Sequence, residues 1–75
     1  MYNVKFSNDV GKVSLIGRSP DKDGCFELIK KFLDEHNYKY YYMRFWDTEF
    51  QGEPATKVDV GSWSEFFYLI KEENK

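Results

Sequence analysis

Apolar and polar residues alternate along the first part of the chain with the period of two that is typical of a half-buried strand. Residues 2–7 alternate strictly, and residues 12–18 alternate until Ile16 breaks the pattern. The turn-forming residues 8–11 (NDVG) separate the two runs. The pattern predicts a β-hairpin over residues 2–18. In its second strand, Val13 and Leu15 would lie on one face, and the other face would carry Lys12, Ser14 and Arg18.

The next segment, residues 19–37, has apolar side chains at helical spacing. One sector of the predicted helix holds Cys25, Leu28, Ile29, Phe32, Leu33 and His36, with Phe26 at its border. Ser19 or Asp21 can accept the first backbone N–H groups, and Asn37 suits a left-handed exit. We expect this helix to pack its apolar sector on a sheet.

Three further elements are expected in the second half of the chain. Residues 38–47 (YKYYYMRFWD) are rich in aromatic side chains and predict a strand. Residues 47–54 (DTEFQGEP) have loop composition, and residues 55–61 alternate again. Residues 62–72 fit either of two structures: the continuous aromatic run favours a strand, whereas Ser62 and Glu65 spell a helical capping box.

These elements define the expected fold class. The sequence predicts a single α+β domain over residues 1–75, with one mainly antiparallel sheet, one helix on one face and the order β-β-α-β-β-β. A helix is the alternative for the last element. The chain has no run of about 20 apolar residues and no signal-peptide pattern at its start. We therefore expect a cytoplasmic protein with no membrane contact.

Candidate catalytic groups do not combine into a site. Cys25 and His36 would lie about 16 Å apart along a helix, because each residue adds about 1.5 Å, and a thiol–imidazole pair needs contact. One cysteine and one histidine are too few for a zinc site of the usual kind. No phosphate-binding glycine pattern occurs. The sequence therefore predicts no catalytic residues, no metal and no cofactor, and a protein that is not an enzyme.

The strand at residues 38–47 carries more aromatic surface than one sheet face can bury. Successive side chains point to opposite faces, and Met43 and Phe45 are the better core candidates of their set. The other set then faces away from the helix, beside cations from neighbouring strands. The predicted partner-binding surface consists of Tyr40, Tyr42, Arg44 and Trp46 with Lys5, Lys12 and Lys57, and Arg18 lies nearby.

Such a surface has three interpretations. Aromatic side chains and arginine are typical anchors for a protein partner, which includes a second copy of the chain. Stacked rings beside cations also suit single-stranded nucleic acid. The third interpretation is structural, because cross-strand aromatic pairs stabilise sheets. The net charge of −2 does not select among them, and a protein partner is the leading hypothesis.

The second half of the chain contains the segments YYYMRFWD and KVDVGSWSEFFYLI, the latter with Asp59, Gly61, Ser62, Phe66, Phe67 and Tyr68. In these residues the chain resembles very short phage and prophage proteins of Gram-positive bacteria. It implies a non-catalytic accessory protein that binds a component of the host or phage, and it assigns no functional residues. The residues 59–62 also fit a structural role, since glycine can adopt a positive φ and Asp or Ser can accept a backbone N–H.

Overall fold

The computed structural model describes residues 1–36, 43–61 and 64–72, and within them the chain forms a five-stranded antiparallel sheet and one helix. The α+β class and the order β-β-α-β-β-β are confirmed. The elements are β1 (Tyr2–Ser7), β2 (Val13–Ser19), α1 (Lys22–Glu35), β3 (Arg44–Phe50), β4 (Glu53–Asp59) and β5 (Phe66–Lys71). In space the strands follow the order β2-β1-β5-β4-β3, so β2 and β3 form the two edges of the sheet.

The hairpin of β1 and β2 contains a β-bulge, which the sequence analysis did not predict. The pairing of β1 with β2 passes from Val4 opposite Gly17 to Lys5 opposite Leu15, which leaves Ile16 as an extra residue. This insertion explains why Ile16 breaks the alternation. Because the parity changes there, Leu15 and Arg18 lie on the same face, and the predicted separation of these two residues is wrong.

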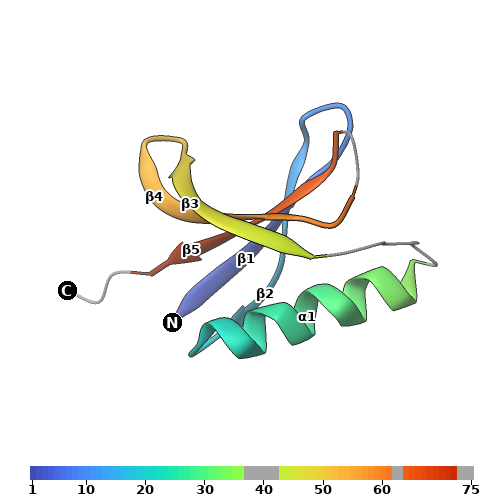
Figure 1. Cartoon of the computed structure of the whole chain (residues 1–75), viewed down its shortest axis with the longest axis horizontal. Coiled ribbons are helices and arrows are strands. Elements are labelled where there is room, and N and C mark those ends of the chain that lie inside the picture. The colour runs from blue at the N-terminus through green and yellow to red at the C-terminus, as the bar shows by residue number, and fades with distance from the viewer. Residues whose placement is uncertain (37–42, 62–63, 73–75) are drawn as a thin grey trace.

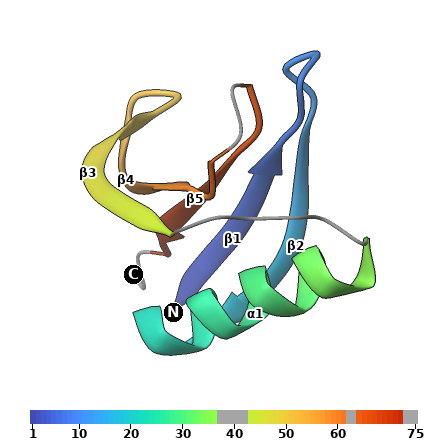
Figure 2. The same ribbon diagram turned by 45° about the vertical axis from the view of Figure 1, so that its right-hand side comes forward.

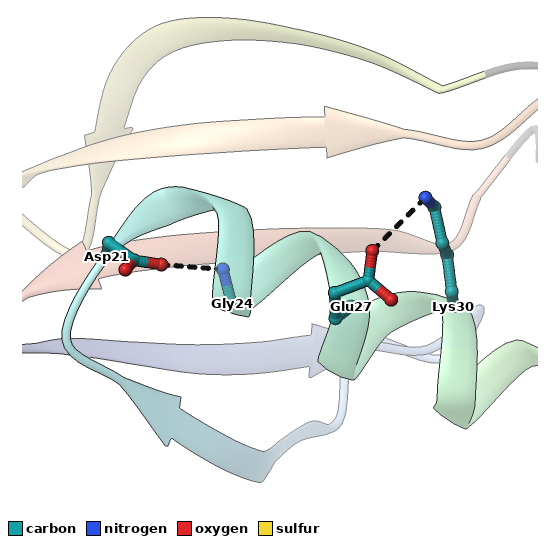
Figure 3. Close-up of polar contacts among 4 residues, drawn as sticks. All are labelled: Asp21, Gly24, Glu27 and Lys30. Atoms are coloured by element: carbon teal, nitrogen blue, oxygen red, sulfur yellow. Dashed lines mark hydrogen bonds and ion pairs between the residues drawn. The ribbon is translucent and has the colours of Figure 1, made fainter.

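Helix α1 begins at a capping residue. Asp21 has an extended backbone, and its Oδ1 accepts a hydrogen bond from the Gly24 N–H at 2.7 Å (Figure 3). Of the two predicted caps, Asp21 therefore takes the role, which satisfies one of the unpaired amides of the first turn. On the exposed side, Lys30 and Glu27 approach to 3.5 Å one turn apart. The helix ends at Glu35, and the predicted exit residue Asn37 lies outside the described residues.

The core lies between α1 and three adjacent strands, β2, β1 and β5 (Figures 1 and 2). Cys25, Ile29 and Leu33 of the helix are fully buried, as their spacing predicts. They pack with side chains of the sheet and with Val60, which directly follows β4. The sheet residues are Val4, Val58, Phe67 and Leu69. His36 is exposed instead of buried, because it follows the last helical residue. Its imidazole stacks on the Phe32 ring, with centroids 4.1 Å apart.

The second hairpin differs from the predicted one. Residues 47–50 belong to β3, so the predicted loop at residues 47–54 is wrong for most of its length. The actual turn is Gln51–Gly52, and both residues have positive φ, at 53° and 81°. Two such residues form a type I′ turn, whose twist matches that of the flanking strands. The predicted start of this strand, at residues 38–42, lies outside the described residues.

The last element is a strand, and the helical alternative is wrong. β5 lies between β1 and β4, and side chains on both of its faces are buried. Phe67 and Leu69 face α1, whereas Ile70 is buried on the opposite face. A central strand covered on both faces has a continuous apolar run without alternation. The described residues contain no helix with the length and hydropathy of a membrane span.

Candidate binding surface

The sheet face opposite the helix, hereafter the open face, carries one row of side chains that crosses all five strands. Neighbouring members of the row are direct cross-strand partners. From β2 to β3 the row is Leu15, Lys5, Tyr68, Lys57 and Trp46. With about 4.8 Å between strands, the row measures roughly 19 Å. The two apolar residues at its ends are prominently exposed, Leu15 by 59% and Trp46 by 43%.

The centre of the open face is a cluster of three rings and two lysines. Phe50 and Tyr68 contact each other with centroids 4.4 Å apart, although their strands are separated by β4. This contact requires the β3–β4 hairpin to curl over the open face, as it does in Figure 1. The Lys57 Nζ lies 4.0 Å from the Phe66 centroid, and the Lys5 Nζ lies 5.8 Å from the Phe50 centroid. The open face is therefore concave and has cationic and aromatic groups at its centre.

Two arginines at this face are paired with carboxylates. The Arg44 Nη2 donates to the Asp59 Oδ2 at 2.7 Å, and Arg18 forms an ion pair with Glu72. Asp59 is nearly buried and also accepts the Gly61 N–H at 2.9 Å. The hydrogen bond from Arg44, helped by the one from Gly61, holds the pKa of Asp59 below its ordinary value against the opposing effect of burial. Both carboxylates thus reduce the positive charge that the open face presents.

The same contacts explain the residues 59–61 in structural terms. Gly61 has a φ of 94°, which side-chain-bearing residues rarely adopt, and Asp59 secures this turn through the Gly61 N–H. The predicted turn role of Gly61 and Asp59 is therefore what the structure contains. Ser62 lies outside the described residues.

The structure brings four of the predicted binding residues to one surface. Lys5, Lys57 and Trp46 belong to the cross-strand row, and Arg44 lies on the same face opposite Asp59. Lys12 does not join them, because it lies in the turn before β2, where its backbone N–H donates to Asn8. Tyr40 and Tyr42 lie outside the described residues.

The sequence analysis did not assign Leu15, Phe50, Phe66 or Tyr68 to the binding surface, although all four lie on the open face. Leu15 lies on this face because the bulge at Ile16 shifts the alternation of β2. In the sequence, the break in alternation at Ile16 is the signal for this shift. Phe50 was assigned to a loop, and its contact with Tyr68 depends on the curl of the hairpin, for which the local pattern contains no signal.

Of the two core candidates in the predicted strand at residues 38–47, one is confirmed and the other is wrong. Met43 packs against the core. Phe45 lies on the helix side and contacts Phe26, with centroids 5.0 Å apart, yet it remains 56% exposed. The helix packs chiefly on β2, β1 and β5, and Phe45 contacts Phe26 at the border of its apolar sector.

Reactive groups are buried or dispersed. Cys25 is fully buried, and burial raises the pKa of its thiol, which keeps it protonated and unreactive. Among residues 1–36, 43–61 and 64–72, no three His, Cys, Asp or Glu side chains are grouped closely enough to hold a metal ion. The arrangement at the open face suits non-covalent contact.

Comparison of the chain with protein-family models, with curated proteins and with solved structures returns no match.

Proposed function

We propose that this protein is a non-enzymatic, cytoplasmic accessory protein of phage type that binds a protein partner through the open face. The observation that carries the proposal is the cross-strand row, in which exposed Leu15 and Trp46 flank a centre of lysines and rings. Apolar and aromatic side chains gathered on one concave surface, here Leu15 and Trp46 with the rings of Tyr68, Phe50 and Phe66 between them, are typical of an interaction site. Tryptophan is also among the residue types that contribute most to protein interfaces.

The contacts within the open face favour protein over single-stranded nucleic acid. Bases need free ring faces, but Phe50 and Tyr68 contact each other and Lys57 covers Phe66. Phosphates need available cations, but Arg18 and Arg44 are paired with carboxylates. A protein partner requires neither feature, since apolar contacts at Leu15 and Trp46 supply its anchors.

The test is a double substitution, Leu15→Ser with Trp46→Ser, in the otherwise unchanged chain. Both side chains are substantially exposed, so we expect the circular dichroism spectrum to stay that of the folded protein. A partner that is captured by the unchanged chain, identified by mass spectrometry and purified should bind the double variant at least about tenfold more weakly, a loss of about 1.4 kcal/mol. Equal affinity would end the proposal.

A matched control separates the open face from general surface apolarity. Val10 is 81% exposed and lies in the turn between β1 and β2. Val10→Ser should leave partner binding unchanged. If it weakens binding as much as the double substitution does, the open face has no special role.

Two further measurements distinguish the alternatives. Titration of a fluorescent single-stranded oligonucleotide at low salt should give a flat anisotropy curve. Binding that weakens steeply with added salt would instead support a nucleic-acid module. Sedimentation equilibrium should show a monomer, and a dimer that dissociates on Leu15→Ser with Trp46→Ser would show that the open face binds a second copy.

A further inference from the structure

The two edge strands of the sheet, β2 and β3, are protected to different degrees against the addition of another strand. On β2, the bulge at Ile16 interrupts the strand and α1 packs beside it. On β3, all seven residues pair with β4 in unbroken register, and the described residues place no further strand on its outer side. β3 contains neither Lys nor Pro, the residues that commonly block strand addition. Within the described part of the chain, the outer side of residues 45–50 is therefore open to another extended segment.

We propose that β3 accepts a sixth strand from a protein partner, an extended segment in which cationic residues alternate with apolar ones. This site is distinct from the open face and does not depend on the function proposed for it. Pairing with the edge would supply backbone hydrogen bonds, and the alternating side chains would supply the specificity.

The side chains of β3 define the chemistry of such a segment. On the helix side, Asp47 and Glu49 are exposed acidic residues two positions apart, and exposed Phe45 precedes them. On the opposite side, Trp46 offers an exposed ring. A paired strand places its side chains about 5 Å from their direct partners. Lys or Arg residues at alternate positions would therefore meet Asp47 and Glu49. The apolar residue that adjoins the cation opposite Asp47, on the side toward Phe45, would lie opposite Trp46.

The nearby lysines do not neutralise this edge. Lys22 and Lys71 line, together with Asp47, a hollow of about 340 Å³ on the helix side. However, Lys71 belongs to β5, which lies two strands inward from β3. A sixth strand would be three strand spacings from β5, roughly 14 Å away. On the helix side of β3, the acidic pair is thus the charge that lies directly beside the incoming segment, whereas Arg44 lies on the opposite side and is paired with Asp59.

The same acids disfavour a second copy of the chain as the occupant. A two-fold antiparallel pairing of β3 with its copy, centred on Asp47, places Asp47 opposite Asp47. A pairing centred on Thr48 places Asp47 opposite Glu49. Like charges directly opposite each other destabilise a strand pair, and centres nearer to Arg44 shorten the paired segment.

The test uses two synthetic seven-residue peptides, matched to the seven residues of β3. One alternates Lys with Val, and the other alternates Glu with Val. Amide chemical shifts of the full chain should change along β3 with the Lys–Val peptide, and the β3 amides that do not pair with β4 should exchange more slowly with solvent. We expect the Glu–Val peptide to bind about tenfold more weakly.

The charge-reversed variant, Asp47→Lys with Glu49→Lys, should bind the Glu–Val peptide more tightly than the Lys–Val peptide. The matched control is Asp34→Lys with Glu35→Lys, which changes the net charge equally on the exposed side of α1. It should leave the original preference intact. The proposal is overturned if the control loses the preference to the same degree, if neither peptide changes the β3 amides, or if those amides are already protected in the free protein. Leu15→Ser, at the opposite edge, should leave peptide binding unchanged, so this site and the open face can fail separately.

Discussion

The half of the sheet under the helix and the β3–β4 hairpin are built differently. In the covered half, Val4, Phe67 and Leu69 are buried against α1, and the strand β5 is apolar on both faces. In the hairpin, most of β3 is exposed although it includes Phe45 and Trp46. Figure 2 shows the hairpin standing away from the helix. The covered half, together with Val58 of β4, thus supplies the buried area that drives folding, and β3 presents apolar and charged groups to solvent.

The largest predicted difference in the free energy of unfolding is between two alanine substitutions, one at buried Phe67 and one at exposed Phe45. Phe67→Ala removes a fully buried ring that contacts Phe6 and Phe32, with centroids 5.0 and 5.6 Å away. We expect it to lower the free energy of unfolding by about 3–5 kcal/mol, which is a large part of the stability of a small domain. Phe45→Ala, on exposed β3, should cost about 1 kcal/mol or less.

Urea denaturation followed by circular dichroism measures both phenylalanine variants. Similar losses for Phe67→Ala and Phe45→Ala would show that the two halves contribute equally. The division described above would then be wrong.

The second effect concerns the ion pair that connects β3 to β4. Asp59→Asn removes the charge that Arg44 pairs with while keeping the size of the side chain, and we expect a loss of about 1–3 kcal/mol. The pKa of Asp59 is lowered in the folded protein, so this stabilisation is fully present above the unfolded pKa of about 4. It fades as the pH falls through the folded pKa.

Denaturation at a series of pH values checks this prediction. The unchanged protein should lose stability as the pH falls below about 4, and Asp59→Asn should show a smaller acid dependence. Asp23→Asn, at an exposed position of α1, serves as the control. An acid dependence that Asp59→Asn leaves intact would assign the effect to other carboxylates.

The smallest effect sharpens the comparison within the covered half. Asp21→Ala removes the side-chain acceptor for the Gly24 N–H and should cost about 1 kcal/mol. Asp34→Ala, far from that cap, should change the midpoint of thermal unfolding much less. Equal shifts would show that the contribution of Asp21 is general charge and not capping.

The elements that bury one face were predictable from the sequence. Alternation in residues 2–7 and the apolar sector of α1 report directly on which side chains meet the core. The end of β3 was not, because Asp47, Thr48 and Glu49 have loop composition. Such residues persist in a strand here because they lie on a solvated edge. The Gln51–Gly52 turn lacks the usual Asn-Gly signal, so the sequence did not indicate where the hairpin turns.

The candidate surface was predictable only in part. Lys5, Lys57, Arg44 and Trp46 share a face because strict alternation assigns them to it. Leu15 depends on an inserted residue, and the contact of Phe50 with Tyr68 depends on the curvature of a whole hairpin. Local periodicity does not determine either feature, since both arise from how distant strands fit together.

The extra residue at Ile16 also bears on how such a surface can evolve. It divides β2 into two stretches of opposite parity, so that Leu15 is directed outward beside Lys5 while Gly17 lies under the Leu28 side chain of α1. Deletion of the Ile16 codon would make Leu15 and Gly17 direct neighbours, and ordinary alternation would keep Leu15 beside Lys5 and Gly17 beside Val4. The bulge can therefore gain or lose one residue of chain length while the outward chemistry of this small protein stays the same.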